Sequence, residues 1–350
     1  MKDGLLLAGD IGATKTTLAL YEAAAWPSAP LRQQTLQNAG FADFDSLLRE
    51  FLGAEKPAPA TVCLGVAGPV MANAVKMTNL NWSINAAGLQ AHFGFDQAHL
   101  INDLVATAMG ALHLPPKDLQ CLNPGKKQDG AAMAVLAPGS GLGEAFVLPH
   151  NETYFPYPSE GGHASFSPRN AEQIALLTFM LKRHAHVSVE QVCSGLVIPD
   201  LLAFMATRQS MPDWLRAELE QVTDRTPIIV QAALASVRGE KPCDIAVSTL
   251  SLFIDILADE AANLALKTLA LGGVFLGGGL APRLLPLIDP HRFMTVFARG
   301  TYQDMLARIP IHIIRNPQTA LLGAAAYGAE AMARSRAAQG PREKAMMPQR

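Results

Sequence analysis

Apolar residues near the start of the chain form two runs, separated by a short group of small and polar residues. Residues 5–8 are apolar, Asp10, Gly12 and Thr14 follow, and an alternating apolar segment continues to residue 20. This order predicts two antiparallel strands joined by a tight turn. Further short apolar runs predict strands at residues 61–67, 75–78, 99–103, 132–136, 272–279 and 310–314.

The second half of the chain has mostly helical periodicity. Helices are predicted after residue 104 and at residues 171–184, 196–206, 227–237, 250–270 and 319–335. Pro115 and Pro116 mark a boundary between two parts of the chain. We therefore expect an α/β protein with two lobes and a cleft between them. Residues 336–350 have no apolar period and are expected to form a disordered tail.

Composition and charge exclude several classes of partner. The 350 residues carry a formal net charge of −2, which gives no electrostatic reason for binding nucleic acid or an anionic membrane. No apolar run approaches the roughly 20 residues that a membrane span requires. The four cysteines are isolated, without C-x-x-C spacing, and this pattern predicts buried thiols in a reducing compartment. We expect a cytoplasmic protein without nucleic-acid or membrane partners.

The first predicted turn combines a carboxylate with a glycine. Successive N–H groups of such a turn can hold an anion, and Gly12 allows the backbone to approach a ligand closely. Asp10 would repel a phosphate unless a cation lay between the two. The pairing therefore predicts a magnesium-bound nucleotide at a hairpin, in contrast to loops that open a helix.

Two later glycine-rich segments each leave two interpretations open. Gly139, Ser140 and Gly141 follow a predicted strand, and they form either a tight hairpin or a second phosphate loop. The glycines at 277–279 form either an ordinary strand-to-helix turn or a close approach to a nucleoside. A second loop of donors suits ATP, because its polyphosphate needs donors from more than one side.

Polar residues at three other places have a structural and a functional interpretation. Asn102 and Asp103 lie where a strand ends and a helix begins, so they serve as an N-cap or as a base and hydrogen-bonding partner for a substrate hydroxyl. Glu160 and His163 share a glycine loop that is either a surface turn or a pair of converging ligands. Glu190 follows a β-branched run and is either a solvated helix-start residue or a ligand.

Together these segments resemble the bacterial glucokinase family, within the superfamily of sugar kinases, heat-shock chaperone ATPases and actin. The resemblance extends in order from residue 5 to about residue 331. The resemblance implies a two-lobed ribonuclease H-like (actin-like ATPase) architecture. In it, a small domain of residues 1–113 is completed by the helix at 318–335, and residues 114–317 form a large domain. The nucleotide motifs of the superfamily correspond here to Asp10, Gly12, Ala13 and Thr14, to Gly139, Ser140 and Gly141, and to Gly277, Gly278 and Gly279.

The resemblance also implies an activity and a set of roles. ATP and Mg²⁺ would be the cofactors, with Asp10 holding Mg²⁺ through water, and D-glucose would be converted to glucose 6-phosphate. Asp103 would be the general base of this reaction, and the enzyme would be a homodimer. The residues expected to contact the hexose are Asn102, Glu160, His163 and Glu190.

Some positions depart from the family pattern. Ala13 and Ser140 replace a glycine and a threonine, which keeps a small side chain and a hydroxyl donor. Residues 194–198 are Ser-Gly-Leu-Val-Ile, where the family usually has Ser-Gly-Pro-Gly-Leu. Two alternatives therefore stand beside glucokinase activity: a kinase of another hexose or N-acetylated amino sugar, and a catalytically inactive sugar-sensing protein. The intact Asp103 and both phosphate loops favour an active enzyme.

Overall fold

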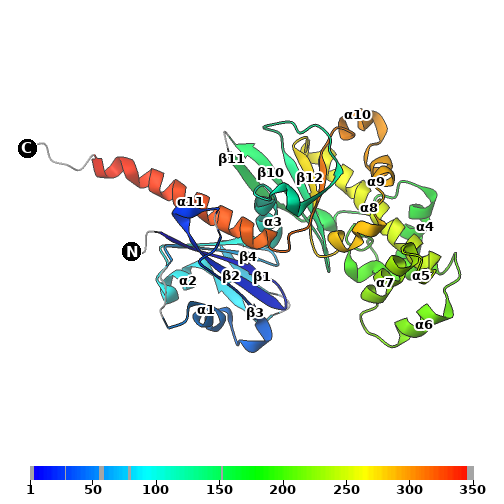
Figure 1. Cartoon of the computed structure of the whole chain (residues 1–350), viewed down its shortest axis with the longest axis horizontal. Coiled ribbons are helices and arrows are strands. Elements are labelled where there is room, and N and C mark those ends of the chain that lie inside the picture. The colour runs from blue at the N-terminus through cyan, green and yellow to red at the C-terminus, as the bar shows by residue number, and fades with distance from the viewer. Residues whose placement is uncertain (1–3, 28, 55–58, 78–79, 151–152, 345–350) are drawn as a thin grey trace, which may run out of the picture. The chain divides into compact units, whose positions relative to one another are not determined.

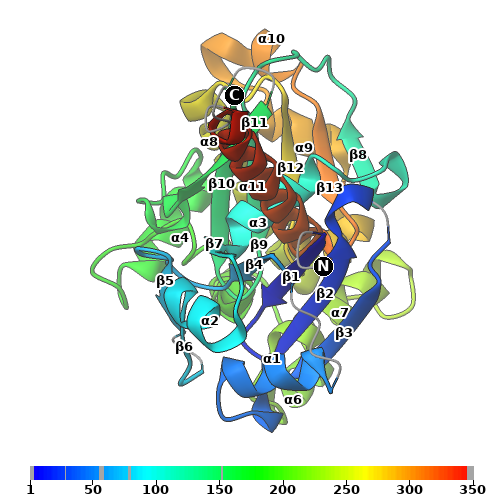
Figure 2. The ribbon, with the colours of Figure 1, turned by 90° about the vertical axis from the view of Figure 1, so that its left-hand side faces the viewer.

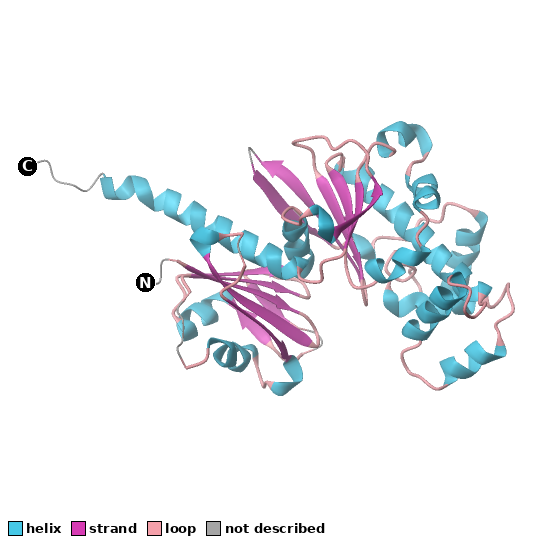
Figure 3. Cartoon of the chain, viewed as in Figure 1, coloured by secondary structure: helices cyan, strands magenta, loops and turns pink. Residues whose placement is uncertain are grey.

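The chain divides into two compact units, each with its own sheet and helices. The computed structural model describes residues 4–27, 29–54, 59–77, 80–150 and 153–344 (Figures 1 and 3). One unit holds the described residues up to Leu114 together with those from Gln318 onward, and the other spans Pro115–Pro317. No helix among the described residues is both long enough and apolar enough to span a membrane.

The first unit is built on a five-stranded sheet with the order β3-β2-β1-β4-β7. β1, β2 and β3 are successively antiparallel, whereas β4 and β7 run parallel to β1. β5 and β6 form a separate antiparallel pair. The strands are β1 Leu5–Ile11, β2 Lys15–Glu22, β3 Arg32–Gln37, β4 Thr61–Val66, β5 Ala74–Lys76, β6 Ser83–Asn85 and β7 Gln97–Asn102.

Alternate residues of β1 face different layers of helices, as the two-residue period of a strand requires. Leu7 and Ile11 are buried with α1 and α2, whereas Leu6 and Ala8 are buried with α3 and α11. Figure 2 shows α11 crossing the sheet beside α3. The helices of this unit are α1 Phe44–Leu52, α2 Ala86–Phe93, α3 Asp103–Ala111 and α11 Thr319–Lys344.

The second unit contains a six-stranded sheet with the order β11-β10-β9-β12-β13-β8. β9, β10 and β11 are successively antiparallel, and β12 and β13 run parallel to β9. The first five strands in this order therefore repeat the order and directions of the other sheet. The strands are β8 Leu119–Asn123, β9 Met133–Pro138, β10 Leu142–His150, β11 Thr153–Ser159, β12 Gly273–Leu276 and β13 Ile311–Ile314.

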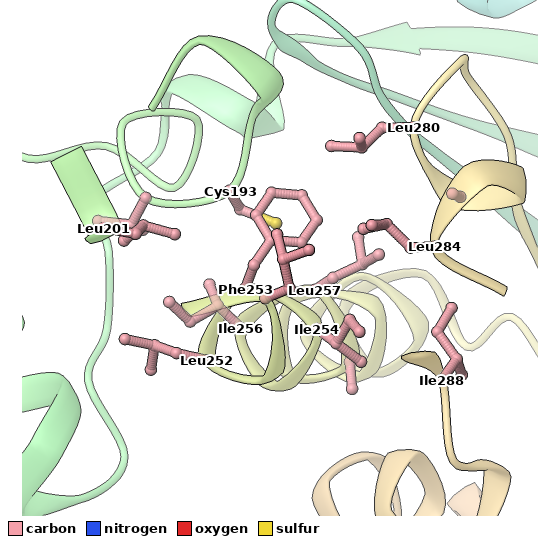
Figure 4. Close-up of a cluster of buried hydrophobic side chains, with 14 of the residues drawn as sticks. Cys193, Leu201, Leu252, Phe253, Ile254, Ile256, Leu257, Leu280, Leu284 and Ile288 are labelled. Atoms are coloured by element: carbon pink, nitrogen blue, oxygen red, sulfur yellow. The ribbon is translucent and has the colours of Figure 1, made fainter. Parts of the chain in front are cut away.

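A long buried helix, α8, organises the core of the second unit. Phe253 and Leu257 of α8 lie between Leu201 of α5 and Leu284 of a 3-10 turn (Figure 4). Pro242 lies two residues before the start of α8 and disfavours a helical conformation at Lys241. The helices are α4 Ala171–Met180, α5 Ile198–Met205, α6 Asp213–Glu220, α7 Thr226–Val237, α8 Asp244–Thr268, α9 Pro290–Phe297 and α10 Gln303–Leu306.

The structure confirms the predicted hairpin at the start of the chain and corrects several boundaries. α8 begins at Asp244, earlier than the predicted residue 250. α4 ends at Met180 instead of residue 184, because Arg183 and His184 both donate to the Met180 carbonyl and close the last turn. The predicted strand at 75–78 is observed as β5, and residue 78 lies outside the described residues.

The C-terminal helix is longer than the sequence pattern predicts. α11 continues to Lys344, so residues 336–344 are helical and the expected tail is wrong over that part. Arg336 and Ala337 are exposed and are both strong helix formers, so the helix passes residue 335 without an apolar period to mark it. Residues 345–350 lie outside the described residues.

Candidate active site

The first glycine turn joins β1 to β2 and is held in place by a buried amide. The Gly12 N–H donates to the Lys15 carbonyl at 3.0 Å. The Asn38 side chain donates to the Gly12 carbonyl at 2.9 Å and accepts from the Thr16 hydroxyl at 2.8 Å. Ala13 and Thr14 at the tip are exposed. A buried amide thus fixes the hairpin while its tip stays accessible to a ligand.

Asp10 and Asp103 lie at the same edge of the first sheet. Asp10 is paired with Gly65 of β4, and the next residue of β4 is paired with Asn102 of β7. A Cβ atom on Gly65 would lie 4.0 Å from the Asp103 Cα, so the first turn of α3 rests on this glycine. Asp10 follows Leu6 and Ala8 by even steps and therefore faces the layer that contains α3. The expected base and the expected magnesium ligand share one edge and one face of the sheet.

Asn102 performs the structural role that the sequence left open. Its Oδ1 accepts from the N–H groups of Leu104 at 2.8 Å and Val105 at 3.4 Å, which makes Asn102 the N-cap of α3. Its Nδ2 also donates to the Gly68 carbonyl at 3.2 Å. Asp103 is then the first residue of the helix, where a carboxylate is favoured by the helix dipole.

Asp10 has the properties of a single-carboxylate magnesium ligand. Burial raises the pKa of Asp10 to about 6, and the positive charge of Lys15 opposes this rise. Within the described residues, no group of three or more histidine, cysteine, aspartate or glutamate side chains could hold a metal. This fits Mg²⁺ rather than a protein-caged metal, because Mg²⁺ commonly binds one carboxylate and completes its shell with water and phosphate oxygens.

In the second unit, Glu190 supports the second glycine turn. The turn joins β9 to β10, and the Gly139 N–H donates to the Gly141 carbonyl at 2.8 Å. The Glu190 Oε2 accepts from the Leu142 N–H at 2.8 Å. A Cβ atom on Gly141 would collide with the same carboxylate oxygen, so glycine is required there for this contact. Glu190 is therefore tied to the loop as well as being a candidate ligand.

His163 lies between Glu160 of its own glycine loop and Glu190 of a separate segment. The His163 Nδ1 lies 3.9 Å from the Glu190 Oε1, and the His163 Nε2 lies 3.9 Å from the Glu160 Oε2. The Glu190 N–H donates to the Gly162 carbonyl at 2.8 Å, which joins the two segments. The side chains of Glu160 and His163 are 74% and 63% exposed, so they are accessible to a solute. Two carboxylates and an imidazole suit a polyhydroxylated ligand.

A buried carboxylate that the sequence analysis missed lies beneath this group. Glu144 of β10 is 2% exposed, and its carboxylate occupies the space that a side chain at Gly161 would need. Burial and the neighbouring Glu260 raise the pKa of Glu144 to about 7, and Lys267 opposes the rise. A charged residue inside an apolar strand is the sequence signal that could have identified it.

The second unit contains a pocket of about 580 Å³ beside the second glycine turn. Gly139 and Ser140 line it together with Gly279, so two of the predicted nucleotide segments share one cavity. Gly278 has a φ of +75°, and a side chain there would collide with the Pro138 carbonyl. The segment 277–279 is thus packed against the end of β9. The volume of the pocket is in the range of small-molecule sites.

Several residues of this pocket were not predicted from the sequence. Thr226 at the start of α7 donates to the Gly195 carbonyl at 2.8 Å, and the Gly195 N–H donates to the Gly139 carbonyl at 2.7 Å. Asp224, Gln231 and Arg283 add polar groups to the wall. The Thr-Pro pair that opens α7 is a sequence signal for the helix, but nothing local indicates that it meets a glycine loop.

A sequence model of the glucokinase family, described as "Glucokinase", matches residues 7–331 of the chain. The chain belongs to the glucokinase family. The glucokinase of Nostoc punctiforme is 38% identical over 333 residues, which cover 92% of this chain and 98% of that protein. The glucokinase of Caulobacter sp. is 33% identical over 327 residues, which cover 92% of this chain and 94% of that protein.

Solved structures extend this likeness to three dimensions. The crystal structure of a glucokinase from an Antarctic psychrotroph matches with a TM-score of 0.79 and 30% identity, covering 93% of this chain and 99% of that one. A ROK-family glucokinase from Streptomyces griseus, solved with glucose and AMPPNP, matches with a TM-score of 0.62 and 18% identity over 93% of this chain and all of that one. The expected α/β fold of the actin-like sugar kinases is confirmed.

Proposed function

We propose that this protein is a glucokinase that transfers the γ-phosphoryl group of ATP to the 6-hydroxyl of D-glucose. The observation that carries the proposal is its membership of the glucokinase family over residues 7–331. The arrangement of charged groups and glycine turns within each unit supports it independently of the family name. The chemistry needs positioning and charge stabilisation more than covalent catalysis, and no nucleophilic side chain is required because the sugar hydroxyl attacks the phosphorus.

The nucleotide is assigned to the glycine turns. Gly12, Ala13 and Thr14 supply backbone donors in the first unit, and Gly139, Ser140 and Gly141 supply them in the second. The pocket of about 580 Å³ next to Ser140 and Gly279 accommodates the nucleoside. The Gly277 N–H donates to the Leu136 carbonyl at 2.7 Å and Gly278 lies against the Pro138 carbonyl, which ties this segment to β9. Asp10 would hold Mg²⁺ through water, and the ion would supply positive charge that offsets the phosphate oxygens.

Asp103 is the proposed general base. It accepts the proton of the attacking hydroxyl as the oxygen–phosphorus bond forms and the bond to the leaving ADP breaks. Its place at the first turn of α3 fixes the carboxylate on a rigid element, because Asn102 already caps that helix. Asn102 contributes its remaining amide N–H to a neighbouring sugar hydroxyl.

Glu160, His163 and Glu190 are the proposed sugar ligands in the second unit. Each sugar hydroxyl loses water on binding and needs a partner, and these side chains offer both acceptors and a donor. The contact between Glu190 and the Leu142 N–H supports a coupling between the sugar ligands and the phosphate loop. We also assign the protein to the cytoplasm as a homodimer, which size-exclusion chromatography with light scattering would test.

A coupled assay of ADP formation with ATP, Mg²⁺ and a panel of sugars tests the proposal. Glucose should give the highest kcat/KM, ahead of fructose, mannose and N-acetylated amino sugars. A higher value for another sugar would support the alternative of a different hexose kinase, for which the sequence at residues 194–198 is the motivating feature. Absence of turnover with every sugar, in protein that still binds glucose, would identify a sugar-sensing protein instead.

A further inference from the structure

A further pocket in the second unit lies away from the glycine turns. It has a volume of about 490 Å³ and is bordered by the segments 126–128 and 304–309 and by Leu271. Gln128 and Leu271 are joined by a backbone hydrogen bond next to the start of β9 and β12. The glycine turns follow the other ends of the same two strands. The two pockets share no residue.

The walls of this second pocket are fixed by the backbone. The Lys126 N–H donates to the Arg308 carbonyl at 2.6 Å, and the Asn123 amide donates to the Ala307 and Ile309 carbonyls at 3.0 and 2.7 Å. Gly125 has a φ of +46°, and a side chain there would collide with the chain near Ile309. A ligand would therefore meet a preformed surface and would not have to order these two segments.

Positive charge gathers around the pocket. Lys126, Lys127 and Arg308 line it with a single carboxylate, Asp304, which leaves a local charge of two positive units in a chain whose net charge is −2. In the described part of the chain, none of these four side chains takes part in an ion pair or a side-chain hydrogen bond. Their charges are available to a ligand that carries about two negative units.

The chemistry of the wall specifies the ligand further. Arginine and lysine bind a phosphate dianion, with arginine able to form paired hydrogen bonds. Asp304 would repel a bare phosphate, but it would accept hydrogen bonds from hydroxyl groups on the same ligand. Leu271 and Met305 are partly exposed and supply an apolar surface suited to the carbon face of a small ring. We propose that this pocket binds a phosphorylated sugar, with the cations on the phosphate and Asp304 on the hydroxyls.

Calorimetric titration with glucose 6-phosphate tests the proposal without relying on turnover. The protein is first saturated with glucose, AMPPNP and Mg²⁺, so that any further binding occurs away from the sites assigned to these ligands. One molecule per chain should bind, and the affinity should fall at high salt because the contacts are partly exposed. The double variant Lys127→Met with Arg308→Met should weaken binding by at least about tenfold, because it loses one or more charged contacts to the phosphate. Lys182→Met with Arg216→Met, at exposed positions elsewhere, should leave it unchanged.

Asp304→Asn separates a sugar phosphate from a simple anion site. This variant should bind inorganic phosphate more tightly and glucose 6-phosphate more weakly than the unchanged protein. Hydrogen exchange should show protection of residues 124–128 and 304–309 when glucose 6-phosphate binds. Absence of binding, binding that survives the double variant, or protection confined to other segments would overturn the proposal. If Asp304→Asn strengthened the binding of both ligands equally, the pocket would be a non-selective anion site. That result would reject the proposal that it binds a phosphorylated sugar.

Discussion

At the scale of single residues, Asn102 and Asp103 at the start of α3 differ in role: Asn102 caps the helix, and Asp103 is the proposed base. Asn102 accepts from the N–H groups of Leu104 and Val105, and the Asp103 Oδ1 also accepts from the Leu104 N–H at 2.9 Å. The sequence left the N-cap and the catalytic interpretation as alternatives for the pair. The structure assigns the cap to Asn102, and the base remains our proposal for Asp103.

Replacing Asp103 tests that proposal directly. Asp103→Ala should lower kcat with glucose by at least about 100-fold, typical of losing a positioned general base, with little change in the KM for ATP. Asp103→Asn should behave in the same way, because an amide cannot accept the proton. Asp129→Ala removes an exposed carboxylate elsewhere and should keep normal turnover. Near-normal kcat in either Asp103 variant would contradict the assignment.

The raised pKa of Asp10 predicts a pH dependence of magnesium use. Burial lifts this pKa to about 6, so the carboxylate is protonated below about pH 6 and ionised above it. A metal ligand must be deprotonated, so the Mg²⁺ concentration for half-maximal rate should rise as pH falls through 6. Steady-state titrations of Mg²⁺ from about pH 5 to about pH 8, which spans the pKa, measure it. Asp10→Asn should need more Mg²⁺ throughout and lose this inflection; an unchanged inflection would contradict the role.

At the scale of elements, each glycine turn is braced by a side chain from a distant segment. Asn38 holds the first hairpin and Glu190 holds the second. Each brace satisfies backbone groups of its turn with buried or half-buried hydrogen bonds, which makes the turn rigid before a ligand arrives. The chain thus obtains preorganised loops without placing them at helix N-termini.

Gly141→Ala should uncouple Glu190 from the second turn. The added methyl group would collide with the Glu190 carboxylate and break its bond to the Leu142 N–H. We expect the KM for glucose to rise and stability to fall by about 1 kcal/mol, the usual value of one hydrogen bond. Gly139→Ala is the matched control, since no atom lies within 4 Å of its added Cβ. An unchanged KM for glucose in Gly141→Ala would show that Glu190 does not act on the sugar through this contact.

The raised pKa of Glu144 predicts how the free energy of unfolding changes with pH. Its pKa is raised from the ordinary 4.5 of a glutamate to about 7 in the folded protein, so between these pH values the native state holds a proton that the unfolded chain releases. Stability from this group is full below about pH 4.5 and declines as pH rises towards 7, by up to about 3 kcal/mol. Glu144→Gln should remove this decline and raise the melting temperature at pH 8. Denaturation at several pH values measures both, and an unchanged slope would refute the prediction.

At the scale of the whole molecule, the same strand order is used in both units. In each sheet a glycine turn joins the first two antiparallel strands, β1 to β2 in one unit and β9 to β10 in the other. The chain returns at its end to complete the first unit with α11, which packs on α3, β1 and β4. Local sequence therefore builds two similar frames, and the return of the chain makes the first unit depend on residues far apart in sequence.

Gly323→Val tests this dependence on the C-terminal helix. A side chain at Gly323 would collide with the Ala106 carbonyl and force α11 away from α3. We expect a loss of several kcal/mol, about the cost of overpacking a core, and a lower melting temperature. Gly40→Ala, where no atom lies within 4 Å of the added Cβ, should be nearly neutral. Unchanged melting in Gly323→Val would show that α11 is not required for this unit.

The sequence predicted those features that depend on neighbouring residues. The alternation around Asp10 and Gly12 was enough to predict the first hairpin, and the apolar run before Gly139 was enough for the second. Helix ends were less accurate. α4 ends with backbone hydrogen bonds to the Met180 carbonyl, and α8 begins at Asp244 without a side-chain cap, and neither feature changes the apolar period. The contact between Glu190 and Leu142 joins residues 48 positions apart and has no local signal.

By itself, the sequence determined two α/β frames with glycine turns, because strand alternation and turn chemistry are properties of residues only a few positions apart. It also determined the glucokinase family through the order of its motifs. Only the tertiary structure decided which side chains brace the turns, that Asn102 is a cap, and that Glu144 is buried beneath the Glu160 loop. Those outcomes depend on packing between distant segments, where burial and the need to satisfy every polar group select a single arrangement.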